Sequence, residues 1–164
     1  MARIFIAIRF NDEVKNTLAN IQNALRAKGV RGNYCPYNNL HLTLAFIGEK
    51  YDLQNIYKAV SEVTFKPFTM TLGELGTFPT KTCVIWCGIK EKEPVTTVAN
   101  KLRERLAAND VGFSAMTFYP HISLVRQPST IVTDIDVPET SITVDRLFVM
   151  RSERIDGELV YSEI

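Results

Sequence analysis

The stretch LHLTLAFIG, residues 40–48, alternates large apolar side chains with polar or small ones. Successive side chains of a β-strand point to opposite faces, so this alternation predicts a strand with one buried face. His41, Thr43 and Ala45 are expected to share the opposite face. The buried face is expected to consist of Leu40, Leu42, Leu44 and Phe46.

A second stretch, YPHISLVR at residues 119–126, has the same pattern around a histidine. His121 and Ser123 follow His41 and Thr43 by 80 residues. Each stretch comes after a β-branched strand and an amphipathic helix, so the same unit is expected at residues 3–47 and again at 82–126. We therefore predict one domain over residues 1–164, of the α/β (α+β) class. It should be bilobal, with two pseudo-symmetric antiparallel-sheet lobes, helices outside and a central cleft between the histidine strands.

Turn residues and periodicity predict the remaining elements. The first helix should begin after an N-cap at Asn11 or Asp12 and end at Gly29. Apolar stripes predict two more helices, over residues 53–63 and 95–106. We also expect a loop over 32–39, a strand over 68–75 ended by a turn at 76–79, a strand over 82–89, and two last strands over 142–150 and 158–162 joined by a hairpin turn at Asp156-Gly157.

The composition is that of a folded globular protein. Apolar residues make up 46% of the chain and charged residues 23%, which excludes a disordered, collagen-like or coiled-coil chain. No apolar run approaches the ~20 residues of a membrane span. The N-terminal segment is too short between its arginines to act as a signal peptide. We expect a cytoplasmic protein with no membrane partner.

Charge and cysteine usage narrow the function classes further. The net charge of +1 gives no overall reason to expect nucleic-acid binding, but residues 1–130 carry 16 basic and 10 acidic side chains while residues 131–164 carry 3 and 8. The basic portion favours local attraction of a phosphate. Three cysteines fit neither a disulfide framework nor a zinc site. The sequence lacks a phosphate-binding glycine loop, which argues against an ATP-dependent ligase.

Both histidines of the chain lie in the pattern His-x-(Thr/Ser). A single histidine beside a threonine on a strand is usually a half-exposed sheet residue, but two matched copies facing one cleft indicate a site. Hydroxyl groups can hold the non-bridging oxygens of a phosphate. One imidazole can act as base and the other as acid near neutral pH, on opposite sides of the phosphorus and without a metal.

The chain resembles the two-histidine phosphoesterase superfamily, and within it the RNA 2′,3′-cyclic phosphodiesterases first described as 2′-5′ RNA ligases (LigT-like). The resemblance rests on NLHLTLAFIG at 39–48, LGELGTFP at 72–79, VIWCG at 84–88 and YPHISLVR at 119–126. It implies a metal-free and cofactor-free enzyme that hydrolyses the 2′,3′-cyclic phosphate end of RNA, or a small cyclic nucleotide, to a 2′-phosphate. Joining of RNA through a 2′-5′ bond would be the weak reverse reaction.

The resemblance also assigns roles to residues. It implies His41 as proton donor to the leaving 3′ oxygen, His121 as proton acceptor from water, and Thr43 with Ser123 as the groups that hold the phosphate. The sequence itself does not order the two histidine roles. Arg126 follows the second motif and is expected to bind phosphate oxygens. Its position has the opposite parity to His121, so it reaches the site only if the strand twists or bulges after Val125.

Some features leave alternatives open. Tyr34 stands where family members often have tryptophan, and it is expected either to stack on a base or to pack at the strand entrance. Members that act on other cyclic phosphates, such as ADP-ribose 1″,2″-cyclic phosphate, differ at the pocket rim. A non-catalytic RNA-binding module is the rival from another class, although binding alone gives no reason for two positioned proton carriers. We expect a monomer.

Overall fold

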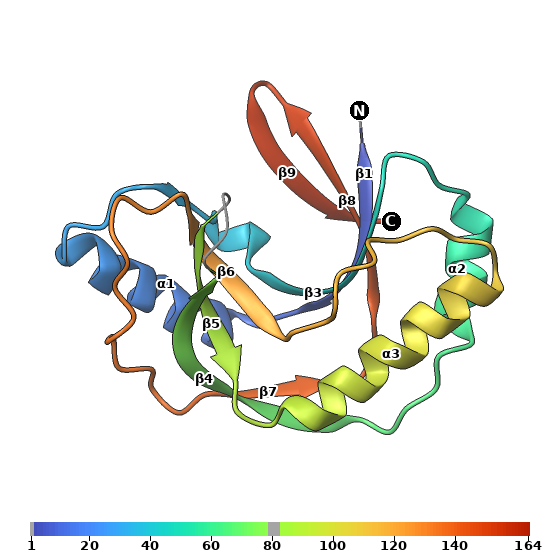
Figure 1. Ribbon diagram of the computed structural model, residues 1–164, viewed down its shortest axis with the longest axis horizontal. Helices are drawn as coiled ribbons and strands as arrows, with labels where there is room; N and C mark the ends of the chain where they lie inside the picture. Colours follow the sequence, from blue (N-terminus) through green and yellow to red (C-terminus); the bar gives the residue numbers. More distant parts are fainter. Residues whose placement is uncertain (1, 79–82) are drawn as a thin grey trace.

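The computed structural model describes residues 2–78 and 83–164, which form two antiparallel sheets and three α-helices (Figure 1). One sheet has the strand order β3-β1-β8-β9 and the other β2-β6-β5-β4-β7. Antiparallel sheets combined with helices confirm the predicted α+β class. Each sheet contains one histidine strand, β3 or β6. The strands are β1 (Arg3–Arg9), β2 (Asn33–Tyr34), β3 (His41–Gly48), β4 (Phe68–Phe78), β5 (Val84–Ile89), β6 (His121–Arg126), β7 (Ser141–Val144), β8 (Phe148–Ile155) and β9 (Glu158–Glu163).

The described residues form three α-helices, and the first of them has the capping residues that the sequence predicts at both ends. Asn11 caps α1 (Asp12–Ala27) by accepting a hydrogen bond from the Val14 amide at 3.0 Å, and Gly29 follows its end with a φ of 84°. That φ lies in the left-handed region, which suits glycine. The other helices are α2 (Leu53–Ser61) and α3 (Lys92–Ala108), and a 3₁₀ turn occupies Tyr37–Asn39.

The connections cross between the two sheets. Helix α1 follows β1 in the chain but packs against β6 of the other sheet, while α3 follows β5 and packs against β3. Helix α2 packs on α3 (Figure 1). A continuous apolar core results, formed by buried side chains from both sheets and all three helices, among them Ile6, Leu18, Leu44, Ile56, Leu102 and Leu124.

Two strand predictions are wrong in extent. The strand expected over residues 142–150 is two strands, because Ile142 pairs with Met70 of β4 whereas Met150 pairs with Phe5 of β1. The chain therefore changes sheets between β7 and β8. The turn expected at 76–79 is also wrong for residues 76–78, because β4 continues through Phe78. Pro79 lies outside the described residues.

Gly76 explains why that segment resembled a turn in the sequence. It pairs with Trp86 of β5, and the indole ring covers it so closely that a Cβ atom would have no room. A glycine in a strand interior can mark close packing of a neighbour as well as a turn.

The last two strands form a hairpin at one edge of the four-stranded sheet, and its tip projects at the top of the view in Figure 1. Asp156 and Gly157 link them with φ values of 52° and 81°. Two successive residues at positive φ are typical of the type I′ turn, so the predicted hairpin turn is confirmed. In the described part of the chain, no helix has the length and apolar character needed to cross a membrane.

Candidate active site

The site begins with the first histidine strand, β3. Leu42 and Leu44 are fully buried in the core, while His41 and Thr43 are half-buried on the opposite face. This is the arrangement that the sequence alternation predicts for those four residues. The alternation then fails, because Ala45 is buried and Phe46 is 41% exposed, the reverse of the expectation.

A β-bulge at Leu44 causes the reversal. Thr43 pairs with Ala7 of β1 and Ala45 pairs with the adjacent Ile6, so Leu44 is an extra residue in β3. An extra residue in one strand shifts the alternation of every side chain after it. Phe46 is thereby turned to the same face as His41.

The second histidine strand, β6, has the same irregularity at the matching position. Ser123 pairs with Trp86 of β5 and Val125 pairs with the adjacent Ile85, so Leu124 is extra. This bulge turns Arg126 to the face of His121, which resolves the parity objection raised by the sequence. The bulge lies one residue before Val125 and not after it.

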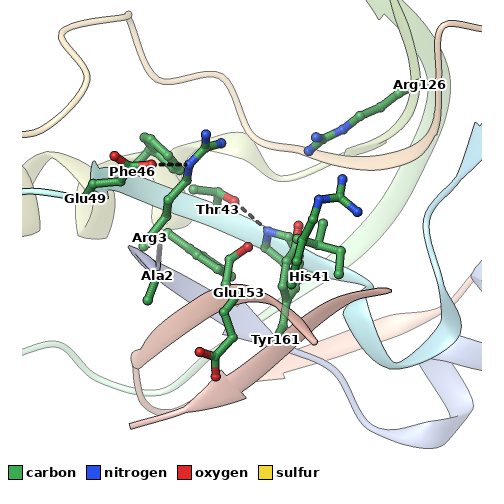
Figure 2. A pocket seen from close by; sticks show the side chains of 13 residues that line it. Ala2, Arg3, His41, Thr43, Phe46, Glu49, Arg126, Glu153 and Tyr161 are labelled. Atoms are coloured by element: carbon green, nitrogen blue, oxygen red, sulfur yellow. Dashed lines mark hydrogen bonds and ion pairs between the residues drawn. The ribbon is translucent and has the colours of Figure 1, made fainter. Parts of the chain in front are cut away.

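The half-buried face of β3 and the Arg126 side chain of β6 line a cavity of about 550 Å³. Figure 2 shows Arg126 reaching from β6 toward His41 and Thr43 on β3. The hairpin and the N-terminal strand complete the walls. The lining residues are Ala2, Arg3, Phe5, His41, Thr43, Phe46, Glu49, Arg126, Ser152, Glu153, Arg154, Leu159 and Tyr161.

Charge at the cavity is mixed, but Arg126 stands apart. Arg3 pairs with Glu49 at 3.3 Å on the rim (Figure 2). Among the described residues, no carboxylate lies within ion-pair distance of Arg126. Its uncompensated guanidinium makes this end of the cavity attractive to an anion.

Hydrogen bonds fix the orientation of both imidazole rings. His41 Nδ1 lies 2.7 Å from the Asn39 carbonyl oxygen, and His121 Nδ1 lies 2.7 Å from the Tyr119 carbonyl oxygen. A carbonyl oxygen only accepts, so each Nδ1 carries the hydrogen and donates. In the neutral rings each Nε2 then has a free lone pair. His41 Nε2 lies 2.7 Å from Thr43 Oγ1, whose hydroxyl can donate to it.

In the free protein, the surroundings of both imidazoles favour the neutral form at neutral pH. The pKa of His41 is lowered to about 4, chiefly by burial; the hydrogen bond to the Asn39 carbonyl opposes this shift, and Arg126 and His121 add to it. Burial and then Arg126 also lower the pKa of His121. Arg126 is therefore close enough to act electrostatically on both histidines.

Aromatic side chains enclose each imidazole. The rings of Phe5 and Tyr161 have centroids 4.9 and 5.3 Å from that of His41. His121 lies 5.0 Å from Phe78 and 6.2 Å from Trp86 by the same measure. Sequence reasoning did not identify Tyr161, Arg3 or Glu153 as cavity residues. Nothing in their local sequence marks them, because the hairpin and β1 meet β3 only in the folded chain.

Not every candidate residue lines this cavity. Ser123 lies on β6 with His121, on the half-buried face of that strand, but neither residue is part of the cavity wall. Tyr34 lies in β2, where its hydroxyl donates to the Val30 carbonyl at 2.7 Å and the Arg26 guanidinium lies 4.0 Å from its ring centroid. It therefore packs beside β6 and away from the cavity.

Over residues 2–78 and 83–164, no group of three or more His, Cys, Asp or Glu side chains is arranged to hold a metal ion. Cys87 is buried in the core, and Cys35 and Cys83 are partly buried.

Known proteins of a phosphoesterase family are similar to this chain in sequence and in fold. The RNA 2′,3′-cyclic phosphodiesterase of Thermotoga maritima is 30% identical over 163 residues, which cover 92% of this chain and 86% of the relative. The crystal structure of Escherichia coli LigT in apo form matches with a TM-score of 0.84 at 27% identity, over 99% of this chain and 94% of that one. The structure of E. coli LigT complexed with 3′-AMP matches with a TM-score of 0.81 at 25% identity, with the same coverage.

Residues 8–86 also match the model of the family described as LigT-like phosphoesterases. The chain belongs to the LigT-like phosphoesterase family.

Proposed function

We propose that this protein hydrolyses the 2′,3′-cyclic phosphate end of RNA to a 2′-phosphate, with His41 and His121 as the acid–base pair. The observation that carries the proposal is the shared geometry of the two imidazoles. Each donates Nδ1–H to the carbonyl two residues before it, which leaves Nε2 as the atom that can accept or give a proton, and Arg126 acts on both. In the free protein His41 Nε2 lies 2.7 Å from the Thr43 hydroxyl. The T. maritima relative is named an RNA 2′,3′-cyclic phosphodiesterase, and the E. coli relative was solved in complex with 3′-AMP.

The reaction needs one bond to form and one to break at phosphorus. His121 Nε2 accepts a proton from water while the water oxygen attacks. The bond from phosphorus to the 3′ oxygen breaks, and His41 Nε2 gives that oxygen a proton. Thr43, Ser123 and Arg126 hold the non-bridging oxygens, where negative charge must be stabilised. The order of the two histidine roles follows the family resemblance.

The acid role requires His41 to gain a proton when substrate binds. In the free protein its pKa is about 4, so the ring is neutral at neutral pH. A phosphodiester anion placed against Nε2 favours the protonated form and raises the pKa. It also offsets the charge of Arg126, which lowers the pKa of this histidine in the free protein. Substrate charge thus prepares the proton donor.

The test is turnover of a short RNA ending in a 2′,3′-cyclic phosphate, in excess chelator. The products are separated and identified by comparison with RNA standards that end in a 2′-phosphate or a 3′-phosphate. The proposal predicts a 2′-phosphate end. ADP-ribose 1″,2″-cyclic phosphate, assayed in parallel, measures the preference between cyclic phosphates. A 3′-phosphate product, or tight RNA binding by a folded protein without turnover of either compound, would overturn the proposal.

A further inference from the structure

Two helix side chains reach the two strand bulges. Gln22 Nε2 of α1 donates to the Leu124 carbonyl at 2.9 Å, and Arg103 Nε of α3 donates to the Leu44 carbonyl at 3.2 Å. Leu124 and Leu44 are the extra residues of β6 and β3. Gln22 and Arg103 are 81 residues apart, as are Leu25 and Leu106 of the same helices. Two chemically different side chains therefore make the same contact at matching positions.

Each side chain also holds the loop that leads into the histidine strand. Gln22 Nε2 donates to the Cys35 carbonyl at 2.9 Å, and Arg103 Nη1 donates to the Met116 carbonyl at 2.6 Å. Cys35 and Met116 are again 81 residues apart. One donor group thus joins a bulge to the loop before the same strand, once in each half of the chain.

Such a donor can determine which strand register is the more stable. A bulge disturbs the regular ladder of hydrogen bonds, and donors from outside the strand pair can stabilise the carbonyl of the extra residue. The Leu124 carbonyl also accepts from the Cys35 amide at 2.9 Å, so Gln22 supplies a second donor there. Gln22 is only 3% exposed, so water does not readily replace it. A donor at this point stabilises the bulged register over the regular one. In the regular register Arg126 and Phe46 would point to the opposite face of their strands.

We propose that Gln22 and Arg103 are positioning residues, which hold the bulges at Leu124 and Leu44 and so keep Arg126 and Phe46 turned into the cavity. The catalytic consequence of these bulges rests on the proposed function, in which Arg126 binds the phosphate. The control of the bulge itself does not depend on any reaction.

The first experiment compares two arginines of the same helix. Arg103→Met keeps the length of the stem and removes the donors. Arg105→Met is the matched control, because Arg105 forms a surface ion pair with Glu62 at 3.8 Å and does not contact β3 through a hydrogen bond. Amide hydrogen exchange of residues 44–46 is expected to accelerate about tenfold in Arg103→Met alone, since the partly buried hydrogen bond to the bulge is lost. Equal protection in both variants would overturn the role of Arg103.

The second experiment uses Gln22→Met, which is close in shape and has no N–H donor. Exchange of residues 124–126 should accelerate by a similar factor, and the affinity for inorganic phosphate should fall about tenfold through displacement of Arg126. In a double variant with Arg126→Ala, the added Gln22→Met change should weaken phosphate binding no further. Unchanged exchange and affinity, or additive losses in the double variant, would contradict the proposal.

A milder variant guards against loss of folding. Gln22→Asn is one methylene shorter and cannot bridge both carbonyls, so it should show the same exchange pattern with a smaller change in the thermal midpoint. Exchange needs neither turnover nor bound phosphate. The exchange test therefore remains valid even if the proposed reaction fails. Unchanged protection of residues 124–126 in both Gln22→Asn and Gln22→Met would reject the positioning role of Gln22, whatever the reaction.

Discussion

At the scale of single residues, the hydroxyl of Thr43 and the charge of Arg126 act on the same imidazole from two sides. Thr43 Oγ1 lies 2.7 Å from His41 Nε2, the atom that must give up a proton in the proposed reaction. Arg126 lowers the pKa of both histidines after the larger effect of burial. Each contact leads to a separate prediction.

Thr43→Val removes the hydroxyl and keeps the β-branched shape of the side chain. We expect kcat to fall roughly 100-fold, by analogy with the loss of one donor to a developing oxyanion. Thr17→Val is the control, because the Thr17 hydroxyl donates to the Glu13 carbonyl on the surface of α1. Steady-state rates on the cyclic-phosphate RNA decide the matter, and an unchanged kcat would remove Thr43 from the site.

Arg126→Gln should move the pH profile of kcat/KM toward higher pH. The guanidinium lowers the pKa of His41 and of His121, so its removal lets both values rise toward 6.5. Both limbs of the bell-shaped profile should shift in that direction, and KM should increase as a phosphate ligand is lost. Arg154→Gln serves for comparison, since Arg154 lines the cavity without contributing to either shift. A profile that stays in place would mean that Arg126 does not act on the histidines.

At the scale of elements, alternation in the sequence predicted β3 and β6 but not their bulges. The apolar pattern of LHLTLAFIG is compatible with an unbroken strand, and the structure departs from it only after Leu44. The cause lies 59 residues away at Arg103, whose Nε donates to the Leu44 carbonyl. A local pattern carries no trace of that contact. Phe46 was therefore expected in the core, and the parity of Arg126 seemed unfavourable.

The split between β7 and β8 escaped prediction for a similar reason. Alternation continues through residues 142–150, but their partner strands belong to different sheets. Capping residues and turns were read correctly at Asn11, Gly29 and Gly157, because their effects are confined to neighbouring residues. Contacts of short range in the chain were predictable from sequence, and those of long range were not.

Gly76→Ala tests the packing of β4 on β5. A Cβ atom at this position would overlap the Trp86 ring, so we expect the free energy of unfolding to fall by about 2 kcal/mol, within the range measured for overpacked cores. Gly112→Ala is the matched control, since nothing lies within 4 Å of its added Cβ. Urea denaturation of both variants measures the difference. Equal stabilities would show that the indole ring can move away at little cost.

At the scale of the whole molecule, the site exists because the chain crosses between two sheets. β3 contributes His41 and Thr43, β6 contributes Arg126, and the β8–β9 hairpin contributes Tyr161. The sequence predicted the repeated unit and its two histidines. It did not show that α1 and α3 each pack against the histidine strand of the other half, because apolar stripes specify burial but not the partner.

The desolvation of His41 also links global stability to pH. The pKa of His41 is about 4 in the folded protein and about 6.5 when exposed, so the unfolded chain binds a proton first as the pH falls. Its contribution to stability is complete above pH 6.5 and is lost progressively down to pH 4. His41→Gln should remove a pH-dependent term on the order of 2 kcal/mol over this window. Urea denaturation at pH 7.5 and at pH 4.5 measures the free energy of unfolding of wild type and variant. The same difference between the two proteins at both pH values would refute the prediction.

The most direct test of the central claim is the rate of each histidine variant on two matched substrates. One is RNA ending in an ordinary 2′,3′-cyclic phosphate, and the other has sulfur in place of the 3′ bridging oxygen, a leaving group that needs no proton. His41→Ala and His121→Ala should both be nearly inactive on the first substrate. The account predicts that the sulfur substrate restores the rate of His41→Ala and leaves His121→Ala inactive. Recovery of His121→Ala in place of His41→Ala would reverse the two roles, and full activity of either variant on the ordinary substrate would contradict the two-histidine mechanism.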